Sequence, residues 1–127
     1  MGLSGEELDA YLQRIGIPDP GVPSLQALTR LQLAHLQTVP FENLAICAGR
    51  SVTTDNAWTF SKIVDQQRGG WCFEANGAFA QLLEALGYHV QRLGAAVLLG
   101  GPTTIIDHLV LEAVSYTHLT LPTTPYV

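Results

Sequence analysis

Ten residues, 68–77, place a cysteine where a thiol can act as a nucleophile. They read Arg-Gly-Gly-Trp-Cys-Phe-Glu-Ala-Asn-Gly, and the cysteine, Cys72, falls in the expected first turn of a helix. The first backbone N–H groups of a helix lack partners inside it and the helix dipole is positive there, so the thiolate is favoured over the thiol. Arg68 adds positive charge, and Gly69 and Gly70 would let a substrate approach the backbone closely. We therefore expect an activated thiol at Cys72.

A thiolate nucleophile needs a base or an imidazolium partner, and His108 is the candidate. It lies in an apolar run, residues 105–111, which predicts a strand that could face the cysteine helix; the alternative is an ordinary packed histidine. A carboxylate must also hold the imidazole in one tautomer. Asp107 would point to the opposite face of the strand, and Glu112 would lie about 13 Å along it at about 3.3 Å per residue. Neither fits that role.

Three further features near the motif each leave two interpretations open. Glu42 is a charge among apolar residues after a proline, either solvated in a loop or paired with Arg68 through two parallel hydrogen bonds. Trp71 and Phe73 flank the thiol and either pack in the core or line an aromatic pocket. Cys47 has no activating surroundings, and we expect it to be structural.

The elements that must position these residues follow from the spacing of apolar side chains. Helices are predicted over four segments, residues 5–15, 25–39, 60–64 and 72–86, with caps at Ser4, Ser24, Thr59 and Gly87. Strands are predicted at 88–93, 95–99 and 105–113, and a loop or short hairpin between Cys47 and Asn56. Helices followed by strands favour an α+β fold with a helical domain over 1–86 and the beginning of a strand domain over 87–113.

Composition narrows the class of ligand. The chain has 127 residues, which suits one modest domain, and a formal charge of −5 with no basic run, which argues against nucleic-acid or anionic-membrane partners. No apolar stretch approaches the roughly 20 residues that span a bilayer, and the first residues lack a secretion signal, so we expect a cytoplasmic location. Two cysteines outside any C-x-x-C pair and scattered histidines predict neither a disulfide scaffold nor a metal site. A small-molecule ligand is expected.

Residues 114–127 differ from the rest of the chain. They carry no charged side chain, no periodicity and no caps. Residues 114–123, Val-Ser-Tyr-Thr-His-Leu-Thr-Leu-Pro-Thr, resemble the translation of a transposon adapter used in sequencing libraries. We expect a non-native tail and leave it out of the fold prediction; a genomic read that encodes the same tail would contradict this.

Three motifs together resemble the arylamine N-acetyltransferases: Pro-Phe-Glu-Asn-Leu at 40–44, the nucleophile motif at 68–77, and the histidine segment at 104–111. The resemblance implies a papain-like Cys-His-Asp transferase fold, with a helical bundle, a β-barrel domain and an α/β lid. Cys72 would take the acetyl group of acetyl-CoA as a thioester and pass it to an arylamine or arylhydrazine nitrogen, with His108 as its partner and no bound cofactor. The resemblance also implies supporting residues, namely Arg68, Glu42, Gly69, Gly70, Glu74 and Asn76, and substrate contacts from Trp71 and Phe41.

In that family the triad aspartate follows the histidine, in an Asp-Val-Gly-Phe-Gly-like motif, and residues 109–113 do not contain it. The resemblance therefore implies a truncated chain with little activity of its own, since a misoriented imidazole costs a comparable serine triad about 10⁴ in kcat. Two other classes of function stay open on the residues alone. One is a thiol-dependent hydrolase or amide-forming acyltransferase of related fold, and the other is a non-catalytic helical interaction module in which Cys72 is merely buried.

Overall fold

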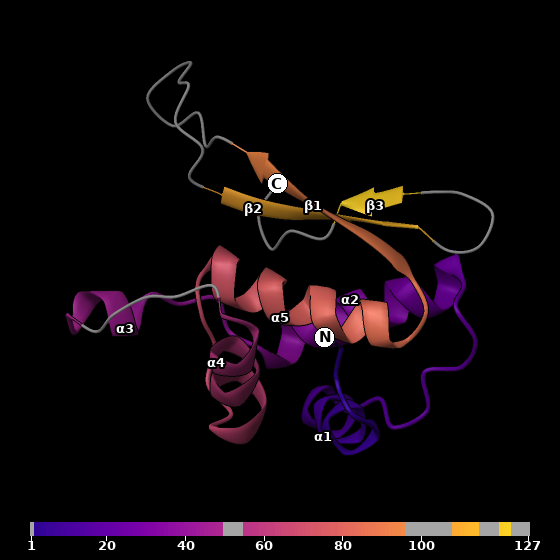
Figure 1. Cartoon of the computed structure of the whole chain (residues 1–127), viewed down its shortest axis with the longest axis horizontal. Helices are drawn as coiled ribbons and strands as arrows, with labels where there is room; N and C mark the ends of the chain where they lie inside the picture. Colours follow the sequence, from indigo (N-terminus) through magenta and orange to yellow (C-terminus); the bar gives the residue numbers. More distant parts are fainter. Residues whose placement is uncertain (1, 50–54, 96–107, 115–119, 123–127) are drawn as a thin grey trace.

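The computed structural model describes residues 2–49, 55–95, 108–114 and 120–122. Its helices come first and its strands last, in the order α1 (Gly5–Ile15), α2 (Leu25–Thr38), α3 (Leu44–Cys47), α4 (Asn56–Phe60), the π-helical turn η1 (Ser61–Asp65), α5 (Cys72–Ala85), β1 (His89–Ala95), β2 (His108–Val114) and β3 (Thr120–Pro122). The sheet covers one side of α5, while α1 and α4 lie on the other (Figure 1). This helix, which begins at Cys72, is therefore the centre of the molecule.

The predicted caps of the first two helices are confirmed. Ser4 and Glu7 form the capping box, because the Ser4 hydroxyl accepts from the Glu7 N–H at 3.2 Å and the Glu7 carboxylate accepts from the Ser4 N–H at 2.9 Å. Gly16 ends α1 in the left-handed region at φ 80°. The Ser24 hydroxyl accepts from the Ala27 N–H at 3.0 Å and starts α2. These local signals place α1 and α2 where the sequence predicts them.

The predicted cap of the next helix is wrong by four residues. Asp55 rather than Thr59 caps α4, since its carboxylate accepts from the Trp58 N–H at 3.0 Å. Thr59 lies buried inside the helix, where its hydroxyl donates to the Asn56 carbonyl at 3.1 Å. A carboxylate three residues before an N–H is itself a strong cap, so the helix begins earlier. α3 was not predicted, because four residues are too few to show a helical period.

The end of α5 is as predicted and joins it to α2. Gly87 has φ 102°, and the Tyr88 N–H donates to the Leu83 carbonyl at 3.0 Å. The Tyr88 hydroxyl accepts from the Ser24 N–H at 3.2 Å and donates to the Ser24 carbonyl at 3.1 Å. The chain just after α5 is thereby tied to the N-cap of α2.

The strands form a three-stranded antiparallel sheet in the order β1-β2-β3. β1 and β2 pair from His89 opposite Val114 to Ala95 opposite His108, which confirms strands near two of the predicted positions. Of the strand expected at 95–99 only Ala95 is described, and it belongs to β1; the start of the strand expected at 105–113 lies outside the described residues. β3 pairs with 112–114 of β2, although no strand was expected after residue 113. Three residues carry too little periodicity to be recognised, and the origin of the tail stays a prediction.

A buried polar pair joins α1 to α2 in the helical core. The Tyr11 hydroxyl lies 2.7 Å from His35 Nε2, and the imidazole lies against Phe79 with ring centroids 4.4 Å apart. Burial lowers the pKa of His35 to about 3, with a smaller contribution from the charge of Arg14, and burial raises the pKa of Tyr11. His35 is therefore neutral in the folded chain at every pH near neutrality.

This buried imidazole predicts acid sensitivity. Below about pH 6.5 the unfolded chain binds a proton at His35 that the folded chain excludes until about pH 3, so the free energy of unfolding falls across that range. The loss attributable to His35 is about 2 kcal/mol at pH 5. Urea unfolding at pH 7.5 and pH 5.0 measures it. His35→Gln should remove this part of the loss, whereas His89→Gln, at an exposed histidine, should not; equal pH dependence in both variants contradicts the assignment.

Candidate active site

The thiol predicted to be the nucleophile lies at the start of the central helix. Cys72 is the first residue of α5 and is 2 % exposed. Trp71 before it is extended, with φ −85° and ψ −177°, and its N–H donates to the Glu74 carboxylate at 3.3 Å. Glu74 thus supplies the carboxylate half of a helix cap. The thiol has the helix position that favours its ionised form.

The strand that begins with the predicted histidine lies against this end of α5. β2 packs on α5 and starts over its first turns (Figure 1), and its first residue is the buried His108. Asn76 lies one turn after Cys72 on the same face of α5, and its amide donates to the Leu109 carbonyl at 2.7 Å. Because Leu109 follows His108 directly, this hydrogen bond holds the histidine end of β2 to the cysteine end of α5.

The segment 40–44 pairs through its backbone with the nucleophile motif, residues 68–77. Phe41 and Gly70 form an isolated parallel bridge. The Glu42 N–H donates to the Gly70 carbonyl at 2.9 Å, and the Gly70 N–H donates to the Pro40 carbonyl at 3.1 Å. The chain just before Cys72 is therefore held by residues 40–42.

This pairing gives the two glycines a structural role. A Cβ atom at Gly69 would lie 1.9 Å from the Pro40 carbonyl oxygen, and one at Gly70 would lie 2.7 Å from Glu74 Cβ. The space that side chains would occupy is filled by the protein itself; the close approach of a substrate stays a prediction. Glycine is needed here so that residues 40–42 and α5 can approach the loop before Cys72.

Four charged side chains lie close together near the first turn of α5. We call this group, which consists of Glu42, Lys62, Arg68 and Glu74, the charge cluster. Lys62 Nζ lies 2.9 Å from Glu74 Oε1 and 3.7 Å from Glu42 Oε1. Arg68 Nη2 lies 3.6 Å from the same Glu42 oxygen, so the predicted pairing of Glu42 and Arg68 is confirmed. The predicted two-bond fork is not formed, because the other Glu42 oxygen accepts from the Leu44 N–H at 2.7 Å and starts α3.

Sequence reasoning missed Lys62. It is 2 % exposed, and its backbone carbonyl accepts from the Arg68 N–H at 3.0 Å. The available signal was its place among the apolar residues Phe60, Ile63 and Val64, but a lysine in a helical segment is most often solvated. The π-helical turn, which sequence patterns do not reveal, is the element that carries it.

The aromatic residues near the thiol are partly exposed. Trp71 and Phe73 are half-buried, with ring centroids 4.8 Å apart, and Phe41 is 36 % exposed. They are neither fully packed in the core nor fully solvated, so both interpretations of the pair stay open. Cys47 is exposed at the end of α3, with its sulfur 3.7 Å from Asn43 Oδ1.

The structure describes one of the two carboxylates that were considered for orienting His108. Asp107 lies outside the described residues. Glu112 lies in β2 opposite Gln91, four residues beyond His108.

Within the described residues there is no group of three His, Cys, Asp or Glu side chains that could hold a metal ion. No helix in the same part of the chain is long and apolar enough to cross a membrane.

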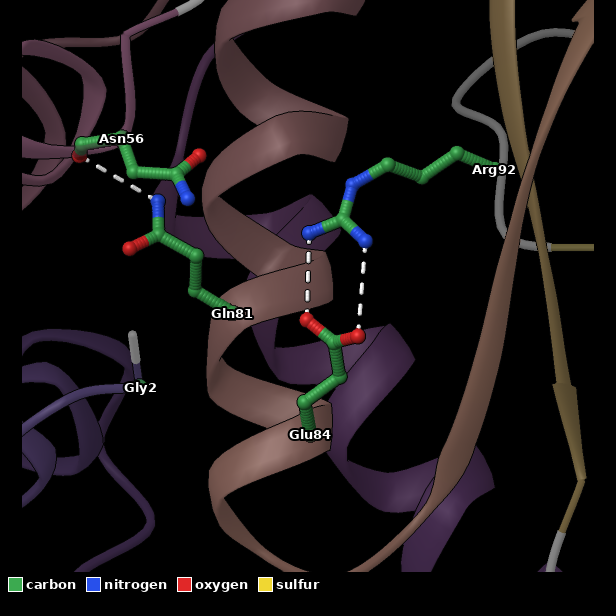
Figure 2. Close-up of a pocket in the computed structure, with 5 residues that line it drawn as sticks. All are labelled: Gly2, Asn56, Gln81, Glu84 and Arg92. Atoms are coloured by element: carbon green, nitrogen blue, oxygen red, sulfur yellow. Dashed lines mark hydrogen bonds and ion pairs between the residues drawn. The ribbon is translucent and has the colours of Figure 1, made fainter.

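A polar hollow of about 400 Å³ lies elsewhere on α5 (Figure 2). Gly2, Asn56, Gln81, Glu84 and Arg92 line it. Arg92 pairs with Glu84 through two hydrogen bonds of 3.1 and 3.4 Å, and the Gln81 amide donates to the Asn56 carbonyl at 3.2 Å. At about 1.5 Å per residue, Gln81 lies about 13 Å along the helix from Cys72, so the hollow is separate from the thiol.

Comparison with known proteins gives consistent matches. A family model described as N-acetyltransferase matches residues 24–117. The arylamine N-acetyltransferase, pineal gland isozyme NAT-3, of Gallus gallus is 44% identical over 95 residues, which are 72% of this chain and 33% of the relative. The solved arylamine N-acetyltransferase of Nocardia farcinica superposes with a TM-score of 0.82 at 36% identity, covering 91% of this chain and 42% of that one.

A second solved structure was determined with a ligand. The arylamine N-acetyltransferase of Mycobacterium marinum, in complex with CoA, has a TM-score of 0.78 at 36% identity, covering 84% of this chain and 41% of that one. The chain spans about a third of the length of the curated relatives it matches. The similarity therefore covers the cysteine and histidine motifs and leaves most of the relatives' length unmatched.

Proposed function

Because this chain belongs to the arylamine N-acetyltransferase family, we propose that Cys72 is the nucleophile of an acetyl transfer and that His108 is its proton-transfer partner. One observation carries the proposal: the thiol at the first residue of α5 is joined, through Asn76 and Leu109, to the strand that His108 begins. Acetyl-CoA is the proposed donor, a choice supported by the CoA complex of the Mycobacterium marinum relative. An arylamine or arylhydrazine nitrogen is the proposed acceptor.

The reaction would proceed in two half reactions. In the first, the Cys72 thiolate attacks the carbonyl carbon of acetyl-CoA, the bond to the CoA sulfur breaks, and CoA leaves with the proton that His108 took from Cys72. In the second, the amine nitrogen attacks the acetyl-cysteine carbonyl and gives its proton to His108, and the bond to the Cys72 sulfur breaks. His108 returns that proton to the departing sulfur. A covalent relay of this kind predicts ping-pong kinetics.

The remaining motif residues are proposed to position the nucleophile and the acceptor. The charge cluster and the glycine pair would hold the loop before Cys72, through the contacts of Glu42 with Arg68 and of Gly70 with Pro40. Asn76 would fix the position along α5 of β2, the strand that begins at His108. The partly exposed rings of Phe41 and Trp71 would contact the aromatic acceptor, since offset rings stabilise one another.

The carboxylate that orients His108 is proposed to lie in a segment that corresponds to the unmatched part of the relatives. Most of a β-barrel and a lid are proposed to lie in the same segment. The loss of tautomer control lowers kcat by about 10⁴ in a comparable triad. We therefore expect the 127-residue chain to form acetyl-cysteine slowly and to turn over poorly. A single acetylation event, however, needs no turnover.

Intact-protein mass spectrometry of the 127-residue chain with excess acetyl-CoA tests the proposal. The expected result is a gain of one acetyl group, which peptide mapping places on Cys72, followed by its transfer to added aniline as N-acetylaniline. Release as acetate, with no N-acetylated product, would indicate the thiol hydrolase instead. A chain that alkylates at Cys72 with iodoacetamide but takes no acetyl group from acetyl-CoA contradicts the acetyltransferase assignment.

A further inference from the structure

Lys62 is the single lysine of the chain, and it is buried. Its ammonium lies between two carboxylates, 2.9 Å from Glu74 Oε1 and 3.7 Å from Glu42 Oε1, and both distances lie within ion-pair range. Burying a lysine is costly unless opposite charge and hydrogen bonds compensate. A buried lysine paired in this way is therefore an arrangement that the fold maintains, not a side chain that solvent tolerates.

The contacts of Lys62 join the two motifs that flank the nucleophile. Glu42 belongs to the segment 40–44, and Glu74 is the third residue of α5, two after Cys72. The same Glu74 oxygen that binds the ammonium also accepts from the Trp71 N–H at 3.3 Å, so Lys62 acts on the turn that contains the thiol. The Lys62 carbonyl accepts from the Arg68 N–H, which ties the backbone of η1 to the start of the nucleophile motif.

The net charge of the cluster affects how strongly the Cys72 thiolate is stabilised. Glu42 and Glu74 are acidic and Lys62 and Arg68 basic, so the cluster is neutral as long as Lys62 is present. Without the ammonium, the Glu74 carboxylate would stand uncompensated in the first turn of α5, where it opposes the favourable effect of the helix N-terminus on a thiolate. The charged and titratable groups that the described residues place around this turn are Glu42, Lys62, Arg68, Glu74 and, on the strand packed against α5, His108.

We propose that Lys62 is a positioning residue for the nucleophile: its buried ammonium neutralises Glu74 and links it to Glu42, which holds the first turn of α5 in place and keeps it favourable to the Cys72 thiolate. This inference rests on the proposed function for its catalytic meaning. It assigns to Lys62 a task that Arg68 does not share, because among the ion pairs of the described residues Arg68 pairs with Glu42 whereas Lys62 pairs with both Glu42 and Glu74.

The test is a charge cycle read by the rate of Cys72 alkylation with iodoacetamide against pH, in a Cys47→Ser background of the 127-residue chain. Lys62→Met keeps the length of the side chain and removes its charge; we expect the pH midpoint of alkylation to rise by about one unit and the rate at pH values well below the midpoint to fall about tenfold. Glu74→Gln should lower the midpoint, because Lys62 then outweighs the remaining carboxylate. The double variant K62M/E74Q should restore the midpoint of the parent chain.

A matched control uses the other ion pair on the same helix. Arg92→Met removes the partner of Glu84, near the far end of α5, and should leave the midpoint unchanged. Lys62→Met that folds and alkylates with the parent midpoint overturns the proposal. If Lys62→Met does not fold, a K62M/E74Q midpoint equal to that of Glu74→Gln overturns it as well, since the charge of Lys62 then has no effect on the thiol.

This cycle is independent of acetyl transfer. If acetyl-CoA fails to modify Cys72 in the parent chain, the proposed function fails while the alkylation midpoints still report on Lys62. If acetylation occurs and the midpoints do not move, the function stands and the role of Lys62 is refuted. The two inferences therefore fail separately.

Discussion

Cys72→Ala should abolish the acetylated form of the chain. After incubation with acetyl-CoA, the variant should show the mass of the unmodified chain, whereas the parent gains one acetyl group on the Cys72 peptide. The reason is chemical, because alanine offers no atom that can form the thioester. In a complete enzyme carrying this motif, loss of the nucleophile should lower kcat by roughly 10⁶-fold, as in a serine triad.

Cys47→Ala is the matched control for this variant. Cys47 is the chain's other cysteine and is exposed, yet it lies in the four-residue helix α3 without the contacts that surround Cys72. Its replacement should leave the yield and the rate of acetylation unchanged. Acetylation that persists in Cys72→Ala, or that disappears in Cys47→Ala, would move the chemistry to another residue.

Gly69→Ala should strongly destabilise the chain. The added Cβ would lie 1.9 Å from the Pro40 carbonyl oxygen, which belongs to the backbone and cannot rotate away. Residues 40–42 must then separate from residues 69 and 70, breaking the backbone hydrogen bonds of Gly70 with Pro40 and with Glu42. We expect the free energy of unfolding in urea to fall by about 3 kcal/mol, the upper part of the range for overpacking. Alkylation of Cys72 should slow in parallel.

Gly77→Ala controls for the glycine itself. Gly77 lies within α5, five residues after Cys72, and a Cβ there would meet nothing within 4 Å. Alanine in a helix is more stable than glycine, so the variant should gain about 0.5–1 kcal/mol. Equal losses in both variants would mean that the close approach to Pro40 is not what requires glycine at residue 69.

Much of the local structure was predictable because its causes lie close together in the chain. The capping box of Ser4 and Glu7, the cap at Ser24 and the left-handed Gly87 each involve residues within a few positions of one another. The start of a helix at Cys72 follows from the same kind of signal, and it suffices to identify the thiol as the candidate nucleophile. His108 was found by the apolar strand around it and by the family motif.

Other features were not predictable because their causes lie far apart. Thr59 has the composition of a cap, but Asp55 caps α4 and burial places Thr59 inside. The close packing of residue 40 and of α5 against Gly69 and Gly70 leaves no mark in the local sequence. A local pattern cannot report a contact made across thirty residues, since the pattern is the same whether the space is empty or occupied.

The sequence by itself determined the family and the candidate chemical groups: a thiol at a helix start, a histidine in a later strand, and the motifs shared with the acetyltransferases. Only the tertiary structure decided how that chemistry is supported. In the folded chain Lys62 is buried between Glu42 and Glu74, and the hydrogen bond from Asn76 to Leu109 fixes the position of β2 along α5. The physical reason is that reactivity of a thiol depends on its local helix and neighbours, whereas charge compensation and strand placement depend on groups that only folding brings together.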